Sequence, residues 1–329
     1  MMSRDELRSK IFSITDSSFT EIALEVFQFQ YGECEIYRRY CILQKTSVQD
    51  VSTIEQIPFL PVELFKTHRI GTGNFIEQKT FISSGTTRDQ SAQHYVHDIK
   101  LYEESILKGF QLFFGSPEQY CFLALLPSYL QKGNSSLVYM ADFLIKETKH
   151  IRSGFFLYNH DDLFNILLSL EAASQKTILL GVSFALLDFA EKFKIHLNHT
   201  AVIETGGMKG RRQEITREAL HDILKRSFGV KNIYSEYGMT ELLSQAYFLE
   251  DQTFHCPPWM KILIRDVNDP LQIIDSDRTG AINIIDLANL DSCAFIATSD
   301  LGKKYHNGTF DVLGRMDYSD VRGCNLLME

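Results

Sequence analysis

The sequence of 329 residues lacks a long apolar stretch. Its first residues, "MMSRDELRSK", are charged and contain no apolar signal core. No segment reaches the ~18 apolar residues that a helix needs to cross a bilayer. These absences exclude integral membrane association, and they predict a cytoplasmic protein.

Long basic runs and paired cysteines of the metal-binding type are missing too. The formal net charge is −9, and no basic run is longer than "KGRR". Because binding to a phosphate backbone depends on clustered Lys and Arg, we expect no nucleic-acid partner. The six cysteines form no CxxC pair and no zinc-type Cys/His spacing. Cys121 and Cys293 lie in apolar runs typical of inert buried thiols, whereas Cys324 has polar, flexible neighbours.

The composition is that of a globular chain. Hydrophobic residues make up 44% of the sequence and charged residues 23%, which is enough apolar material for a large core. The sequence contains no internal repeat and no low-complexity linker. One compact body with a β-rich appendage is therefore favoured over two tethered domains.

The order of the expected elements indicates an α/β fold. Residues 1–78 are expected to be a helical N-terminal part, within which Pro58 and Pro61 rule out a continuous helix. Over residues 79–254, apolar strands such as "KTFIS", "YCFLALL" and "KTILLG" alternate with amphipathic helices. This alternation predicts an α/β body whose largely parallel sheet is buried on both faces.

The helical period disappears after about residue 255. Segments such as "MKILIRDV" and "GAINIIDL" over residues 255–310 predict a smaller antiparallel, β-rich subdomain. The predicted fold class is therefore a layered α/β domain over residues 1–310 with this subdomain near its end, followed by a short C-terminal tail over 311–329. Ligands are expected at the loops beyond the carboxyl ends of the parallel strands.

The first candidate loop is "FISSGTTRDQS", residues 81–91. Hydroxyls and exposed amides around a glycine can donate several hydrogen bonds to phosphate oxygens. It is not a Walker loop, because no GK[ST] follows, and an ordinary Ser/Thr/Gly turn stays open as an alternative. The polar residues concerned are Ser83, Ser84, Gly85, Thr86 and Thr87.

The second candidate loop is "IETGGMKGRR", residues 203–212. Gly206 and Gly207 would let a flat ligand lie against the backbone. Positive charge follows at Lys209, Arg211 and Arg212. The alternative is a strand-to-helix turn with a solvated basic start.

The third candidate loop is "IYSEYGMTE", residues 233–241. An aromatic ring, a glycine, a hydroxyl and a carboxylate follow one another within five residues, as Tyr237, Gly238, Thr240 and Glu241. Such a set can stack on a base, bind a phosphate and hold magnesium, which prefers one or two carboxylates plus phosphate oxygens.

The fourth candidate is "TSDLG", residues 298–302, followed by "DVLGRMD", residues 311–317. Asp300, expected at the end of a strand, can accept both hydroxyls of a ribose, and Arg315 can donate to ribose or phosphate. Taken alone, "DLG" is typical of a turn.

In this order the four segments resemble the adenylate-forming superfamily, which includes acyl-CoA and aryl-CoA ligases. "SSGTT" is similar to its phosphate loop, "ETGG" to its adenine-facing loop and "YGMTE" to its most recognisable segment. "TSDLG" and "VLGRMD" are similar to its ribose-binding aspartate and to the arginine before its hinge. The likeness runs from about residue 58 to the end, although "RDQS" stands where the superfamily loop has a glycine and a lysine.

The resemblance implies a site for ATP and Mg²⁺. Tyr237 would stack on adenine, Asp300 would bind the ribose hydroxyls beside Arg315, Thr240 would contact a phosphate and Glu241 would bind magnesium. A carboxylate would attack the α-phosphate, pyrophosphate would leave and an acyl-adenylate would remain, a reaction catalysed mainly by positioning and charge neutralisation. The implied nucleotide-binding residues are Ser83 to Thr87, Gly206, Gly207, Tyr237, Gly238, Asp300 and Arg315.

Most members of the superfamily continue beyond the arginine into a mobile domain that carries a catalytic lysine. Only fourteen residues follow Arg315, so we expect this domain and its lysine to be absent. Lys209, Arg211, Arg212 or a partner protein are the candidates for the missing positive charge.

With "IPFLPVELFK" before the phosphate loop and "RGCNLLME" at its end, the chain resembles the LuxE-type acyl-protein synthetases of bacterial luminescence and their relatives. In that family the activated fatty acyl group passes to a cysteine near the C-terminus and then to a partner protein. Cys324 matches this position. An acyl-adenylate is a mixed anhydride open to attack by a thiolate, which Arg315 and Arg322 would favour.

The resemblance thus implies an ATP-dependent ligase that forms acyl-AMP from a carboxylic, by family a fatty, acid and carries the acyl group as a thioester of Cys324 to a partner protein. Cys324, Thr240 and Lys209 would be its catalytic residues. Two alternatives stay open: direct transfer of an acyl or aryl group to coenzyme A or a carrier protein, and nucleotide or acyl binding without turnover. His94 and His97 are expected at the start of a helix, with capping or surface roles favoured over a place in the nucleotide or acyl pocket.

Overall fold

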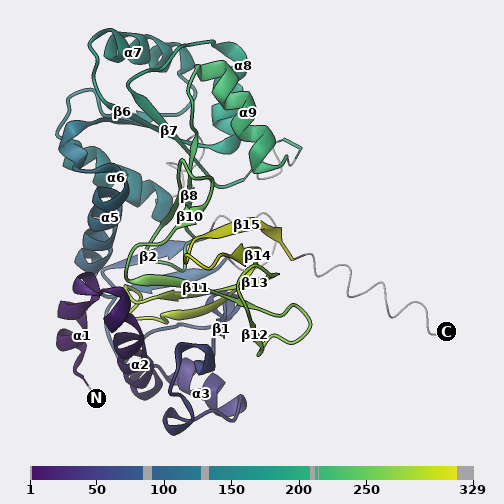
Figure 1. Ribbon diagram of the computed structural model, residues 1–329. Helices are drawn as coiled ribbons and strands as arrows, with labels where there is room; N and C mark the ends of the chain where they lie inside the picture. The colour runs from purple at the N-terminus through teal and green to yellow at the C-terminus, as the bar shows by residue number, and fades with distance from the viewer. Residues whose placement is uncertain (1, 84–90, 127–132, 208–211, 214, 317–329) are drawn as a thin grey trace.

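The computed structural model describes residues 2–83, 91–126, 133–207, 212–213 and 215–316. In these ranges, no helix combines the length and the apolar character that crossing a membrane would require. Figure 1 shows helices α7, α8 and α9 around β6 and β7 at one end of the molecule, and α1 to α3 beside the antiparallel strands at the other.

The N-terminal part consists of α-helices, three short 3-10 helices, connecting loops and one short strand within the described residues. Helix α1 begins with a capping box, in which the Ser3 amide donates to Glu6 and the Glu6 amide donates to the Ser3 hydroxyl. The proline-containing stretch forms β1, which pairs in parallel with β14. The elements are α1 Arg4–Lys10, α2 Asp16–Glu33, α3 Glu35–Leu43, β1 Leu60–Pro61 and α4 Leu64–Thr67.

In the part of the chain that the structure describes, five parallel strands form the α/β body, in the order β8, β7, β6, β4, β5. Every residue of β4 and β6 is buried, which explains their uninterrupted apolar sequences. The strands are β4 Cys121–Leu125, β5 Gly154–Phe156, β6 Thr177–Val182, β7 Thr200–Thr205 and β8 Tyr234–Tyr237. The helices are α5 Ile99–Phe114, α6 Ser136–Thr148, α7 His160–Ala172, α8 Ser183–Lys192 and α9 Arg217–Phe228.

The antiparallel strands that follow are hydrogen-bonded to this body. Strand β9 pairs with β8, and the path continues through β10, β15, β14, β13 and β11 to β12. The last strand, β15, includes residues 311–315, so the boundary expected between 310 and 311 falls inside the sheet. The strands are β9 Ala246–Phe248, β10 Phe254–His255, β11 Met260–Arg265, β12 Ile273–Ile274, β13 Thr279–Asp286, β14 Phe295–Lys304 and β15 Phe310–Arg315.

The segment around the first candidate loop differs from the expectation. "KTFIS" does not join the parallel sheet: β2, Lys79–Ile82, pairs antiparallel with β3, Gln93–Val96, in a separate two-stranded sheet. Just beyond this pair of strands, the Ser83 amide donates to the Ala92 carbonyl and the Ala92 amide donates to the Ser83 hydroxyl. His94 therefore lies on a strand, and the helix begins only at Ile99, capped by Asp98.

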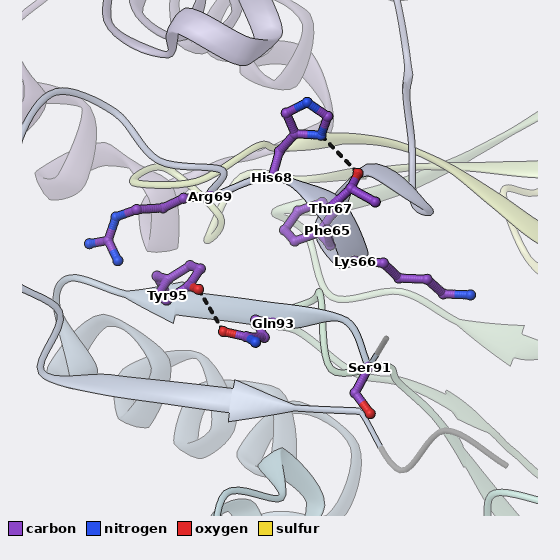
Figure 2. Close-up of a pocket in the computed structure, with 8 residues that line it drawn as sticks. All are labelled: Phe65, Lys66, Thr67, His68, Arg69, Ser91, Gln93 and Tyr95. Atoms are coloured by element: carbon purple, nitrogen blue, oxygen red, sulfur yellow. Dashed lines mark hydrogen bonds between the residues drawn. The ribbon is translucent and has the colours of Figure 1, made fainter. Parts of the chain in front are cut away.

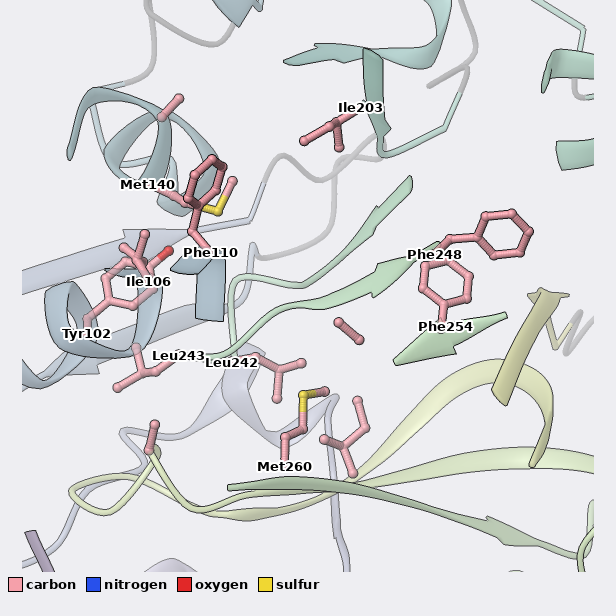
Figure 3. Close-up of a cluster of buried hydrophobic side chains, with 14 of the residues drawn as sticks. Tyr102, Ile106, Phe110, Met140, Ile203, Leu242, Leu243, Phe248, Phe254 and Met260 are labelled. Atoms are coloured by element: carbon pink, nitrogen blue, oxygen red, sulfur yellow. The ribbon is translucent and has the colours of Figure 1, made fainter. Parts of the chain in front are cut away.

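Aromatic and aliphatic side chains fill the space between the helices and the sheet. Figure 3 shows this core running from Tyr102 and Phe110 of α5, past Met140 of α6, to Phe248 and Phe254 of the antiparallel strands. Because these side chains form one cluster, the parallel and the antiparallel strands share a single core. Burial of a side chain of this size contributes about 1.5–3 kcal/mol to stability.

Buried polar contacts join the N-terminal helices to the rest. Gln30 of α2 is fully buried, and its amide donates to the carbonyls of Asn289 and Leu290 at 2.8 and 2.9 Å. Its amide oxygen accepts from the Ala294 backbone at 2.9 Å. One side chain thus satisfies three backbone groups of the loop between β13 and β14.

Replacing Gln30 tests this connection. Gln30→Leu removes all three hydrogen bonds and leaves buried backbone groups unpaired, so we expect the free energy of unfolding to fall by at least about 2 kcal/mol. Urea unfolding measures the change. The matched control is Gln111→Leu on the exposed face of α5, expected within about 0.5 kcal/mol of the wild type; equal stabilities for the two variants would contradict the assignment.

Candidate active site

Three of the predicted residues meet at the junction of the parallel and antiparallel strands. Asp300 of β14 is 6% exposed, and Arg315 of β15 lies directly across from it. The Tyr237 hydroxyl, at the end of β8, donates to Asp300 Oδ2 at 2.7 Å, and Arg315 Nε donates to Asp300 Oδ1 at 3.3 Å. Burial, and then the Asp300 carboxylate, raise the pKa of Tyr237 well above its usual value, so its hydroxyl remains a donor.

Aromatic neighbours hold the Tyr237 ring. Phe254 and Phe310 contact it edge to face, each with ring centroids 5.9 Å away. The guanidinium of Arg315 is different, because its side chain is 80% exposed. The site therefore combines a fixed ring and a fixed carboxylate with a cation that is paired through Nε but exposed to solvent over most of its side chain.

Glu241 lies close to this group. It is 7% exposed, and burial raises the pKa of its carboxyl to about 7. The positive charges of Arg315 and Lys66 oppose this rise, and the charge of Asp300 adds to it. Among the described residues there is no cluster of three or more His, Cys, Asp or Glu that would hold a metal alone. One buried carboxylate fits Mg²⁺, which takes its other ligands from phosphate and water.

The side chains of His94 and Asn289 bind backbone carbonyls of the "YGMTE" segment. His94 is 1% exposed; its Nδ1 donates to the Thr240 carbonyl at 2.9 Å, and its Nε2 accepts from the Ser292 hydroxyl at 2.9 Å. Asn289 donates its amide to the Glu241 carbonyl at 2.8 Å. The expected capping or surface role of His94 is thus wrong, because its strand packs inside the molecule. His97 stays half-exposed and stacks on Phe75.

Two acids that sequence analysis missed, the buried Glu204 and the half-buried Glu236, lie close in sequence to the two glycine loops. Gly206 has φ +67°, a conformation that favours glycine, and its carbonyl accepts from the Ser183 hydroxyl at 2.8 Å. At Gly238, a Cβ atom would collide with the Glu236 carboxyl. Burial, followed by the charge of Glu204, raises the pKa of Glu236 to about 7. Glu236 precedes Tyr237 in a strand, a position that carries no recognisable signal in one sequence.

Several predicted residues lie outside the described part of the chain. They are Ser84, Gly85, Thr86, Thr87, Lys209, Arg211 and Cys324. Ser83 and Gly207 are described just beyond the ends of β2 and β7, next to these segments. Arg212, a candidate for the missing positive charge, is instead paired with Glu191 at 2.6 Å and with Asp188, both on α8.

Solved structures show which class of fold this is. The 2-hydroxyisobutyryl-CoA ligase in complex with 2-HIB-AMP and CoA matches with TM-score 0.64 and 12% identity, over 94% of this chain and 71% of that one. ATP-bound MatB from Rhodopseudomonas palustris matches with TM-score 0.51 and 16% identity, over 72% of this chain. The match spans about half of MatB, 47% of its length. The chain therefore has the fold of the adenylate-forming enzymes, as predicted.

Sequence comparison identifies one family within this class of fold. The chain belongs to the family described as "Acyl-protein synthetase, LuxE", whose family model matches residues 12–329. A long-chain-fatty-acid–luciferin-component ligase of Aliivibrio fischeri is 22% identical over 342 residues, covering 94% of this chain and 87% of the relative. Its counterpart in Photorhabdus luminescens is 36% identical over 67 residues, covering 20% of this chain and 57% of that protein. The predicted family is confirmed.

The contacts of His94 predict a pH effect. Burial lowers its pKa to about 4 in the folded protein, whereas the unfolded chain protonates this residue below about 6.5. Between these values the unfolded state binds more protons, so His94 makes folding less favourable as the pH falls from about 6.5 to about 4.

His94→Gln is the comparison, because glutamine can donate to Thr240 and accept from Ser292 but does not titrate. Relative to this variant, we expect the wild type to lose about 1.4 kcal/mol of stability per pH unit within this window. Urea unfolding across the window measures the difference. Parallel pH curves for the two proteins would contradict a buried neutral imidazole.

Proposed function

We propose that this protein is an ATP-dependent ligase that activates a fatty acid as its acyl-adenylate. The observation that carries the proposal is the contact of Tyr237 and Arg315 with Asp300, in a chain of the acyl-protein synthetase family. The relatives' name, which joins a long-chain fatty acid to a luciferin component, supports a fatty substrate.

ATP would lie across the ends of β8 and β15 and the middle of β14, because Asp300 lies inside its strand, Phe295–Lys304, and not at the strand end where the sequence placed it. Each oxygen of Asp300 accepts one hydrogen bond from the protein and keeps acceptor capacity for the two ribose hydroxyls. The ring of Tyr237 would stack on adenine while its hydroxyl stays bound to Asp300. Gly206 and Gly207 would leave room for the nucleotide beside the backbone.

Catalysis of adenylate formation depends on neutralising phosphate charge, and it needs no covalent bond between enzyme and substrate. The fatty carboxylate would attack the α-phosphorus of ATP, forming a C–O–P bond, while the bond to pyrophosphate breaks and its electron pair leaves with pyrophosphate. Glu241 would hold Mg²⁺, which would neutralise phosphate charge. Ser83 and the neighbouring hydroxyls would donate to phosphate oxygens, and Thr240 to a phosphate held near Glu241.

The acyl group would then pass to the Cys324 thiol. The thiolate would attack the acyl carbon, a thioester would form and AMP would leave with the electrons of the broken C–O bond. A partner protein would accept the acyl group from this thioester. Family membership and the position of Cys324 in "RGCNLLME" support this step.

The nucleotide site is tested by ATP–pyrophosphate exchange dependent on fatty acid and Mg²⁺. Tyr237→Phe keeps the ring but removes one hydrogen bond to a buried carboxylate, so we expect kcat/KM for ATP to fall roughly 10-fold or more. Tyr305→Phe is the matched control: Tyr305 also donates to an aspartate, Asp311, at 2.7 Å, but at the turn between β14 and β15. Equal losses in the two variants would contradict the site.

Acyl transfer is tested with labelled fatty acid, ATP and Mg²⁺. We expect hydroxylamine-labile label on the protein, lost in Cys324→Ser with exchange retained, because only the thioester acceptor is removed. Cys256→Ser, at a half-buried thiol, is the control and should keep the label. Exchange without protein label would indicate direct transfer to coenzyme A or a carrier, and no exchange with any carboxylate would indicate binding without turnover.

A further inference from the structure

A pocket of about 330 Å³ lies between α4 and strand β3. Figure 2 shows α4 on one side and β3 on the other, with Lys66 and Ser91 both in the right half of the view. The described residues that line it are Phe65, Lys66, Thr67, His68, Arg69, Ser91, Gln93 and Tyr95. None of these eight carries a negative charge, so the pocket suits an anion.

Most polar groups of this lining already have partners. Arg69 pairs with Glu77 at 2.7 Å and lies 4.3 Å from the ring of Tyr95. His68 shares a hydrogen bond of 2.8 Å with Thr67. Lys66 is exposed, and within the described ranges its ammonium has no carboxylate within 4.0 Å. Lys66 is therefore the lining cation that is available to a ligand.

The pocket lies between two parts of the proposed nucleotide site. Ser91 lines it and directly follows the "SSGTTRDQ" segment in the chain. On the other side, Phe65 contacts the ring of His94 edge to face at 5.8 Å, and His94 binds the Thr240 carbonyl. Lys66 also lies near enough to Glu241 for its charge to oppose the raised pKa of that carboxyl.

We propose that Lys66 binds the β- and γ-phosphate oxygens of ATP and the pyrophosphate that leaves. The inference rests on the proposed function, because it assigns the leaving group of that reaction. The ammonium would donate charge-assisted hydrogen bonds to phosphate and stabilise the charge that accumulates on pyrophosphate as the bond to the α-phosphorus breaks. A cation from "IPFLPVELFK" would thus act beside Ser91, the last residue of the "RDQS" stretch.

The experiment compares ligands with and without these two phosphates. Dissociation constants for ATP and AMP, and KM for pyrophosphate in exchange, are measured on the full chain for Lys66→Met and Lys66→Arg. We expect Lys66→Met to weaken ATP and pyrophosphate binding roughly 10- to 100-fold. AMP affinity should stay unchanged, and Lys66→Arg should recover part of the loss. Lys231→Met, at an exposed lysine outside the pocket lining, should match the wild type.

Each result has a distinct meaning. An equal loss of AMP and ATP affinity, or a raised KM for the fatty acid alone, would overturn the assignment of Lys66 to the terminal phosphates. Unchanged ATP and pyrophosphate binding in Lys66→Met, with exchange intact, would overturn it and leave the proposed function standing. If the wild type binds ATP but shows no exchange, and Lys66→Met binds ATP more weakly, the result would support the assignment of Lys66 to the terminal phosphates and contradict the ligase activity. A wild type that binds neither ATP nor pyrophosphate would overturn both.

Discussion

The contact of Asp300 with Tyr237 and Arg315 joins two parts of the sheet that run in different directions. Tyr237 ends the parallel body, whereas Asp300 and Arg315 belong to the antiparallel strands. A buried carboxylate is stable only when it is well hydrogen-bonded, so this contact constrains how the two parts meet. The nucleotide would lie across that junction, so the geometry of its site would depend on how the parallel and antiparallel strands are placed against each other.

A second layer of buried polar groups supports the "YGMTE" segment. His94 and Asn289 hold the carbonyls of Thr240 and Glu241, and Asp286 accepts from the amides of Leu243 and Ser244 just beyond. These contacts come from β3 and, far along the chain from it, from the end of β13 and the loop that follows. A loop held at its backbone in this way leaves its side chains free to face a ligand, which is the preorganisation that charge-stabilising catalysis needs.

Local charge matters because the whole chain is acidic. A net charge of −9 repels a nucleotide triphosphate at long range, so binding depends on cations at the site itself. Arg212 is already paired with two acids of α8, Asp188 and Glu191. Arg315 and Lys66 are exposed cations near Glu241, and they approach it from opposite ends of the sequence.

The order of the motifs was enough to determine the fold class and the family, because short strands, glycine turns and the spacing of "YGMTE" and "TSDLG" are local properties of the chain. Tyr237, Glu241, Asp300 and Arg315 could be named as neighbours in this way. Only the tertiary structure decided that the parallel and antiparallel strands form one continuous sheet and that "KTFIS" pairs with β3 in a separate hairpin. It also decided that His94 is buried and binds the backbone of Thr240. It also brought Lys66 beside Ser91, because contacts between segments distant in sequence depend on packing, which no single stretch encodes.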